Sequence, residues 1–235
     1  KTVTCKVMIE ELAMQGVPGI IIDPKGDLSS MAQLASPEEL SDFGVDPAIL
    51  EKFRENVEVV IWTPGSKKGI PLSISPLKFD DLDPLSEDEK RTYYNDVAIT
   101  MLSLMNYDIE SDGAKSNVIV LSELFNYCIN NGKPIHDVDH IIENLVKLPK
   151  EISKEISHIS NAEKINKLIL RLRLLNKGAN NQLFNVGYPL DIDMLLGTDR
   201  DNGKTRLSIV YLNTITNHAG KEFFISLLAQ KLYHW

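Results

Sequence analysis

The first third of the chain alternates between helical spacing of apolar residues and short continuous apolar runs. Helical spacing predicts a helix over 2–15, and shorter helical patterns lie near 28–34 and 47–56. The continuous apolar runs predict buried strands over 18–23 and 57–63. The apolar residues that mark the first helix are Val3, Val7, Met8 and Leu12. Because the strand runs do not alternate with polar residues, both faces of their sheet should be covered. This rhythm predicts an α/β layer with parallel strands.

The middle of the chain has only helical patterns. An acidic, proline-containing stretch at 79–89 is typical of a linker. Four helical patterns follow it, at about 89–107, 115–130, 138–147 and 162–176. No strand pattern interrupts them, so we expect an all-helical insertion over 86–177.

The end of the chain returns to the α/β pattern, with a buried strand over 206–213 and an amphipathic helix over 222–235. Its inward face should hold Phe223, Phe224, Leu227, Leu228 and Leu232. We therefore predict one discontinuous domain, with 1–85 and 178–235 on either side of the insertion. The chain opens and stops inside helical patterns, so we expect it to be an internal piece of a longer protein.

Composition narrows the class of protein. The 235 residues are 43% hydrophobic and carry a formal net charge of −8, which is ordinary for a globular protein and argues against a wholly basic nucleic-acid coat. Two cysteines, Cys5 and Cys128, cannot build a disulfide framework and favour a reducing, cytoplasmic compartment. No stretch approaches the roughly 18 apolar residues that span a bilayer, and no secretory signal opens the chain.

The first candidate for chemistry is Lys1-Thr2, at the start of the first predicted helix. Lys followed by Thr is the last part of the phosphate-binding pattern G-x-x-x-x-G-K-[ST]. A helix start offers free N–H groups and a partial positive charge to phosphate, the Lys neutralises phosphate oxygens, and the Thr hydroxyl ligates Mg²⁺. The glycines of the pattern are not in this sequence, so on the dipeptide alone an unrelated terminus is the simpler interpretation.

The second candidate is the turn from Asp23 to Asp27, with sequence DPKGD, at the carboxyl end of the first strand. Ligands of parallel α/β sheets bind beyond the carboxyl ends of the strands. The alternative is an ordinary strand-to-helix turn in which Asp27 is the N-cap.

Taken together, the order of segments resembles a known family. A Lys-Thr helix is followed by GVPGIIIDPKGDLSSM, VVIWTPGSKKGIPLSI and RLSIVYLNTI, and then by a Phe-rich helix ending in LYHW. This order resembles the HerA/FtsK superfamily of P-loop ATPases, and within it the HerA-like ATPases. The resemblance covers roughly 1–77 and 206–235, and it implies a P-loop NTPase core of the RecA/FtsK-like type with a parallel sheet.

The resemblance also implies a site for ATP and Mg²⁺. By position, Lys1, Thr2 and Val3 would bind the nucleotide, and Thr2 and Asp23 would contact the metal. The turn residues Asp23, Lys25 and Asp27 would lie near the γ-phosphate as the catalytic group. Asn213, at another strand end, would sense the γ-phosphate or simply cap its strand. The family's glycine loop and its Asp-Glu strand are absent, so this chain alone should not hydrolyse ATP, whereas the full-length protein should.

The function that the resemblance implies is an ATP-driven DNA translocase or helicase, acting in DNA-end processing or DNA transport. The implied partners are double-stranded DNA, further copies in a hexameric ring, and a nuclease or other protein. Two alternatives stay open: a nucleotide-gated binding module that uses the helices as a docking platform, and a protein-transport ATPase on the same core.

Arginine and lysine residues outside these motifs have two interpretations each. Arg171 and Arg173 suit arginine fingers, which stabilise transition-state charge in a neighbouring subunit, but a solvated helix face is the simpler interpretation. Lys67 and Lys68 form a basic turn that suits a phosphate backbone but is more often merely solvated. With these arginines, Lys164 and Lys167 make a suggestive basic group.

A pair of histidines also resembles a metal site. His136 and His140 have the i, i+4 spacing of ligands on a helix. However, a third strong ligand is not evident, and acidic residues are expected at a helix start. A structural role is therefore the simpler interpretation.

Overall fold

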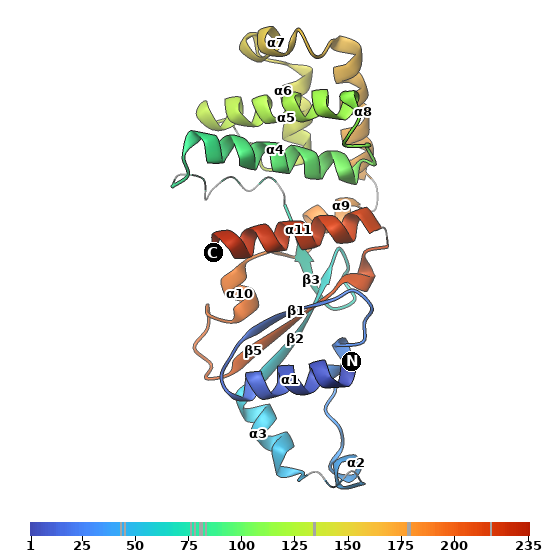
Figure 1. The fold of residues 1–235 in the computed structure, drawn as a ribbon, viewed down its shortest axis with the longest axis vertical. Helices are drawn as coiled ribbons and strands as arrows, with labels where there is room; N and C mark the ends of the chain where they lie inside the picture. Colours follow the sequence, from blue (N-terminus) through green and yellow to red (C-terminus); the bar gives the residue numbers. More distant parts are fainter. Residues whose placement is uncertain are drawn as a thin grey trace. The chain divides into compact units, whose positions relative to one another are not determined.

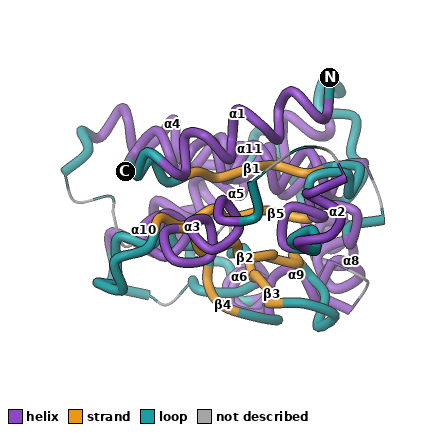
Figure 2. Tube along the Cα trace, turned by 90° about the horizontal axis from the view of Figure 1, so that it is seen from below, coloured by secondary structure: helices purple, strands orange, loops and turns teal. Residues whose placement is uncertain are grey.

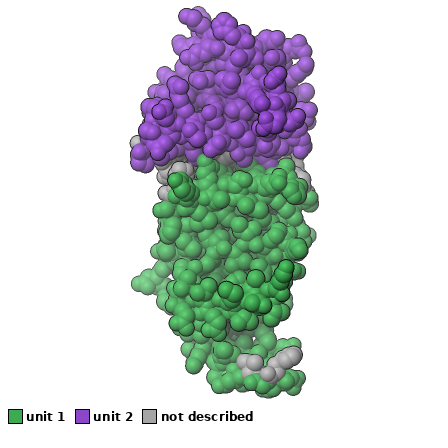
Figure 3. Space-filling model, viewed as in Figure 1, with its two compact units in different colours: residues 1–74, 185–235 green, residues 75–184 purple. Residues whose placement is uncertain are grey.

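The computed structural model describes residues 1–42, 44, 46–75, 77, 79, 82, 84–133, 135–177, 180–216 and 218–235. The chain forms two compact units (Figure 3). Unit 1 consists of Lys1–Ile74 and Asn185–Trp235, and unit 2 consists of Ser75–Phe184. In the predicted acidic linker, residues 80, 81 and 83 lie outside the described residues. The interpretation of 86–177 as an insertion into an ATPase core stays a prediction.

Unit 1 is built on a five-stranded sheet with the order β1-β5-β2-β3-β4 (Figure 2). Every neighbouring pair of strands is parallel. The strands are β1 (Gly19–Asp23), β2 (Val57–Pro64), β3 (Ile70–Ser73), β4 (Tyr188–Pro189) and β5 (Thr205–Tyr211). The α/β class and the three long strands are thus confirmed. The two short strands were not predicted, because β3 contains a proline and β4 has only two residues.

Chain segments far apart in sequence meet in the centre of this sheet. β5 lies between β1 and β2, with Ile209 paired to both Ile21 and Ile61. The indole N–H of Trp62 donates to the hydroxyl oxygen of Ser208 at 2.9 Å, in the buried interior. The carboxyl ends of β1, β5 and β2 therefore lie side by side, in that order, along one edge of the sheet.

Among the residues that the structure describes in unit 1, seven helical segments accompany the sheet. They are α1 (Thr2–Met14), η1 (Ser29–Ala32), α2 (Pro37–Asp42), α3 (Ala48–Asn56), α10 (Ile192–Leu196), η2 (Leu212–Thr214) and α11 (His218–His234). The predicted inward face of α11 is confirmed at four of its five positions, Phe223, Phe224, Leu227 and Leu228. The fifth, Leu232, is exposed, because the last turn of the helix extends beyond the hydrophobic core.

Helix α1 packs against the sheet through a face that the apolar spacing of the sequence does not predict. Ala13 is fully buried, and Ile9 and Met14 pack against the same hydrophobic core. In contrast, the four apolar residues that marked the helix in the sequence are between 51% and 74% exposed. The spacing thus predicted the helix correctly, but these residues do not form the contact with the sheet.

Unit 2 contains helices only among its described residues. They are α4 (Glu87–Leu104), α5 (Asp112–Asn130), α6 (Val138–Val146), α7 (Lys150–Ile156), α8 (Ala162–Lys177) and most of α9 (Asn180–Asn185). Short polar side chains cap the starts of three of them: Ser86 forms a capping box with Glu89 at α4, and Ser111 and Asp137 cap α5 and α6. The short α7 and α9 were not predicted.

The core of unit 2 is aromatic at its centre. Tyr94 and Phe125 are fully buried, and the ring of Phe79 lies 5.8 Å from Tyr94 and 5.5 Å from Phe125. Tyr94 of α4 is therefore part of the hydrophobic core. None of the described helices is long and apolar enough to cross a membrane.

Candidate functional site

The turn after β1 is organised by one buried carboxylate. Asp23 is 1% exposed. Its Oδ1 accepts a hydrogen bond from the backbone N–H of Gly26 at 2.7 Å, and its Oδ2 accepts from Leu28 at 3.0 Å and Ser29 at 2.9 Å. Asp23 therefore satisfies the free N–H groups at the start of η1. The alternative in which Asp27 is the N-cap is wrong, because Asp27 is exposed and makes no such bond within the described chain.

A tyrosine at the end of β5 closes the other side of this turn. Gly26 has φ +91°, and a Cβ placed on it would lie 2.8 Å from Cε2 of Tyr211. Tyr211 is also the residue paired in register with Asp23. The amide of Asn213 donates to the Tyr211 hydroxyl at 3.4 Å. The structure thus brings the DPKGD turn and Asn213 together through Tyr211.

Sequence reasoning overlooked Tyr211. The signal was an aromatic residue near the end of the predicted strand over 206–213, two positions before Asn213. Which glycine it would meet could not be derived, because the pairing of β1 with β5 joins segments far apart in the chain.

The first turn of α1 lies at the same edge of the sheet. The short connection at 15–18 makes α1 run antiparallel to β1, so the start of the helix lies toward the carboxyl end of the strand. The Lys6 ammonium donates to the Ser30 hydroxyl at 2.6 Å, which joins α1 to the segment after the turn. Lys1, Thr2 and Val3 are all exposed.

The loop after β2 adds two further cations to this edge. Lys67 and Lys68 are exposed in it. The buried Thr63 hydroxyl donates to the carbonyl of Ser66 at 2.9 Å, and a Cβ on Gly69 would lie 2.8 Å from Thr63 Cγ2. This loop is therefore tightly folded, and its lysines lie at the carboxyl edge beyond β5.

The exposed side chains of this edge suit a phosphate ligand. They combine lysines with a hydroxyl and with the free N–H groups of a helix start. The cations that reach the edge are Lys1, Lys25, Lys67 and Lys68. Both oxygens of the Asp23 carboxylate already accept backbone hydrogen bonds, whereas the Asp27 side chain on the same turn is exposed.

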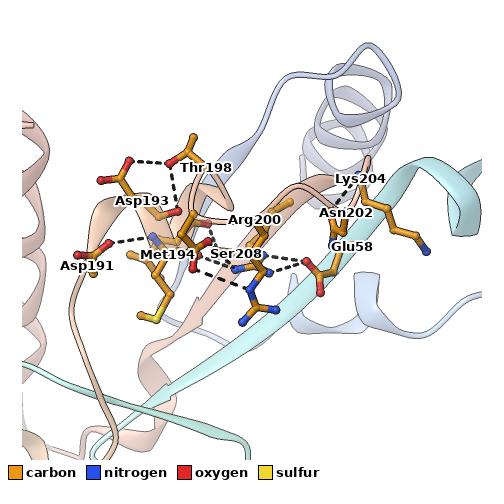
Figure 4. A network of polar contacts seen from close by, with 12 residues as sticks. Glu58, Asp191, Asp193, Met194, Thr198, Arg200, Asn202, Lys204 and Ser208 are labelled. Carbon is orange, nitrogen blue, oxygen red and sulfur yellow. Dashed lines mark hydrogen bonds and ion pairs between the residues drawn. The ribbon is translucent and has the colours of Figure 1, made fainter.

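The opposite, amino edge of the sheet holds a network of polar contacts (Figure 4). Arg206 is 2% exposed and donates from Nε at 2.9 Å and Nη2 at 2.7 Å to one carboxylate oxygen of Glu58. Its Nη1 donates to the carbonyl of Met194 at 2.7 Å. This network joins β2, β5 and α10, and its hydrogen bonds indicate a structural role.

Some of the candidate residues of unit 2 make contacts within that unit, whereas Arg173 is exposed. Arg171 donates to the Met105 carbonyl at 3.4 Å and lies over the Tyr107 ring at 5.6 Å. Asp137 accepts from the backbone N–H of His140 at 2.8 Å, which confirms that the acidic residue caps a helix.

The two histidine rings, His136 and His140, lie 6.0 Å apart in an edge-to-face arrangement. Within the described parts of the chain, no three potential ligands gather for a metal ion.

Comparison with known families agrees with the geometry at the carboxyl edge. Residues 1–85 match the family model described as helicase HerA-like, C-terminal. Residues 1–85 are HerA-like in sequence. This HerA-like segment contains α1, the DPKGD turn and the loop after β2, so the resemblance seen in the sequence is confirmed there.

The fold of the whole chain has a counterpart among solved structures. VirB4 of Thermoanaerobacter pseudethanolicus matches it with a TM-score of 0.50 and 18% sequence identity, over 99% of this chain and 75% of the VirB4 chain. At this identity the likeness shows the fold alone. Comparison with curated proteins gave no match.

Proposed function

We propose that the full-length protein is a P-loop ATPase that binds ATP and Mg²⁺ at the carboxyl edge of the sheet. The observation that carries this proposal is the HerA-like match over residues 1–85, which contains Lys1, Lys25, Lys67 and Lys68. The fold supports it, because the start of α1 and the DPKGD turn both lie where ligands of parallel sheets bind.

The residues divide into two groups by what they offer a nucleotide. Lys1 neutralises phosphate oxygens, Thr2 offers its hydroxyl to the metal, and the backbone of Val3 belongs to the same helical turn. Lys25 and Asp27 are exposed on the turn that Asp23 holds, so they are the turn residues available to a γ-phosphate and its water. Bound Mg²⁺ supplies Lewis-acid stabilisation of phosphate charge.

Asp23 and Asn213 have narrower roles than the family resemblance implies. We assign Asp23 primarily to positioning, because both of its carboxylate oxygens are hydrogen-bonded to backbone amides. A metal contact would have to use the remaining lone pair of Oδ1. Asn213 is exposed beside Tyr211, and we propose that its amide senses the γ-phosphate.

For the whole protein we propose a cytoplasmic DNA translocase or helicase that works as a hexameric ring. ATP would lie between subunits and double-stranded DNA would pass through the centre, in DNA-end processing or DNA transport. A nuclease or another protein would complete the system. The support for this choice is the helicase description of the matching family.

A protein-transport ATPase is the second candidate, since the same core occurs in VirB4 as a fold. A nucleotide-gated binding module with little turnover is the third. The three candidates differ in turnover and in its response to DNA.

The test is the ATPase rate of the full-length protein, with and without double-stranded DNA. Wild type is compared with Lys1→Ala and with Lys52→Ala, an exposed lysine of α3 that serves as the control. We expect DNA to raise the rate, Lys1→Ala to lower it by about 100-fold or more, and Lys52→Ala to leave it unchanged. Turnover that ignores DNA would favour protein transport, and no turnover in wild type would favour the binding module.

A further inference from the structure

Helix α8 (Figure 1) carries two exposed leucines. Leu170 and Leu174 are 59% and 60% exposed, although they lie one turn apart in a well-formed helix. The core-facing side of the same helix is already complete, with Leu168, Leu172 and Leu175 buried. The two exposed leucines therefore do not belong to the hydrophobic core of unit 2.

The exposed leucines lie in a longer stripe with coiled-coil spacing. Going along α8, the stripe alternates steps of four and three residues, as in a heptad seam. Its members are Glu163, Lys167, Leu170, Leu174 and Lys177. We call these five residues the α8 seam. Only the two central positions of the seam are apolar, so it offers one partner helix a pair of leucines with charged residues at both ends.

Basic residues flank the seam on both sides. Lys164 and Arg171 lie along one side, and Arg173 lies along the other, so no flanking residue is acidic. Counted with the seam, α8 carries five Lys or Arg and one Glu in a chain whose net charge is −8. The helix is thus a local basic surface on an acidic protein.

Most of this charge is not neutralised within unit 2. Lys167 pairs with Glu163 at 2.8 Å, and both side chains are largely exposed. Lys164 and Arg171 donate only to backbone carbonyls, those of Ile159 and Met105.

The other two cations of α8 are Arg173 and Lys177. The side chains of Arg173 and Lys177 make no hydrogen bond or ion pair with the described part of the chain.

We propose that the α8 seam binds an acidic amphipathic helix of a partner protein. That helix would pack leucine or isoleucine side chains against Leu170 and Leu174, and it would place Asp or Glu beside Arg173 and Arg171. Residues that flank a heptad seam select the partner by charge, so basic flanks select acidic ones. The same charges disfavour pairing with α8 of a second copy, because like charges would face each other.

Two other occupants fit the surface less well. A nucleic-acid backbone would satisfy the cations, but it would leave the central leucines without an apolar partner. A bilayer surface requires a broad apolar face, whereas only two leucines lie between the basic rows. The proposal concerns unit 2 and does not rest on ATP hydrolysis by unit 1.

The test uses two synthetic helical peptides and the full chain. Both peptides have three heptads with leucine at the seam positions, and they differ only in having Glu or Lys at the flanking positions. Binding is measured by fluorescence anisotropy at low salt and at high salt. We expect the Glu peptide to bind the wild-type chain, with affinity falling as salt rises, and the Lys peptide to bind at least tenfold more weakly.

Variants separate the apolar contribution from the charge contribution. Replacing both leucines, Leu170→Gln with Leu174→Gln, and reversing two charges, Arg173→Glu with Lys177→Glu, should each weaken the Glu peptide by about tenfold or more. Ile119→Gln on α5, where the side chain is 43% exposed, is the control and should bind as wild type. Circular dichroism verifies that every variant is folded.

Three results would overturn the proposal. The first is that the wild-type chain does not bind the Glu peptide. The second is that the two peptides bind equally well. The third is that the leucine variant binds the Glu peptide as tightly as wild type, and that duplex DNA or phosphatidylserine vesicles displace this peptide as well as unlabelled Glu peptide does. That result would make α8 a general anion-binding surface.

Discussion

At the end of β1, a single carboxylate determines the shape of the candidate site. Asp23 accepts three backbone hydrogen bonds, and these hold the turn that exposes Lys25 and Asp27. The sequence could predict that a turn lies here, from its proline and glycine. It could not predict which aspartate is bonded to the backbone, because Asp23 and Asp27 both lie at plausible capping distances along the chain.

Gly26 is the residue whose replacement tests this geometry most sharply. Gly26 and Gly16 have similar positive φ angles, +91° and +85°, but only Gly26 faces a neighbour, the ring of Tyr211. We expect Gly16→Ala to lower the free energy of unfolding by about 1 kcal/mol from backbone strain alone. Gly26→Ala should lose about 2–4 kcal/mol, because the overlap with Tyr211 is added. Urea denaturation measures both, and equal losses would contradict the close approach to Tyr211.

The two cysteines should differ in reactivity. Cys5 is exposed on α1, whereas Cys128 is buried in α5. Burial raises the pKa of the Cys128 thiol, and the nearby Lys133 offsets this only in part. Iodoacetamide at pH 8 should therefore modify Cys5 in the native chain and leave Cys128 unmodified until urea is added. Mass spectrometry of the peptides checks this, and equal modification of both under native conditions would contradict the burial of Cys128.

At the scale of elements, periodicity predicted which segments are helices better than it predicted which face they bury. For α5 and α6 the apolar spacing and the buried face coincide, because each packs within unit 2. For α1 the spacing marks the exposed side, and Ala13, whose small side chain permits close packing, contacts the sheet instead. The short β3 and β4 have too few residues for any period to be visible.

The ion pair between Arg206 and Glu58 should matter far more than an exposed pair of the same kind. Arg206 is buried and also donates to the Met194 carbonyl, so its loss leaves two acceptors unsatisfied. Removing one partner of a buried ion pair lowers the free energy of unfolding by about 3–5 kcal/mol. Because Glu58 is partly exposed, we expect Arg206→Ala to lower it by about 3 kcal/mol. Arg54→Ala, which breaks an exposed pair with Glu51, should cost about 0.5 kcal/mol or less.

Urea denaturation of the two arginine variants distinguishes these costs. Comparable small losses in both would mean that Arg206 does not hold β2, β5 and α10 together.

Glu123 gives unit 2 a dependence of stability on pH. Burial raises its pKa above the usual 4.5, the carboxylate of Glu155 and a hydrogen bond with it raise the pKa further, and Arg91 acts in the opposite direction. A raised pKa in the folded state means that folding favours the protonated Glu123 carboxyl. The stability that this group contributes is therefore complete below pH 4.5, and it is lost as the pH rises through the pKa of Glu123 in the folded state.

Glu123→Gln should therefore flatten the dependence of the melting temperature on pH above 4.5 and raise that temperature at pH 7. Glu143→Gln, at an exposed position of α6, is the control and should leave the profile unchanged. If both variants followed the wild-type profile, Glu123 would not be the titrating group.

At the scale of the whole molecule, the sequence predicted the parallel sheet, the helical block and the HerA-like segment, because each leaves a local pattern or motif. It could not predict the sheet order, in which β5 lies between β1 and β2, since that pairing joins distant segments. The order is what places Tyr211 and Asn213 beside the DPKGD turn and so builds the candidate site.

The central claim is that nucleotide binds at the carboxyl edge of this sheet and not at the amino edge. Its most direct test compares two exposed lysines of unit 1, Lys25 at the carboxyl edge and Lys204 just before β5 at the amino edge. The measurement is the affinity of the full-length protein for Mg²⁺-ATP by isothermal titration calorimetry. Because a lysine–phosphate contact is worth about 1.5–3 kcal/mol, Lys25→Ala should weaken binding by about tenfold or more, and Lys204→Ala should leave it unchanged. Equal affinities for wild type and Lys25→Ala, or a greater loss in Lys204→Ala, would contradict the account.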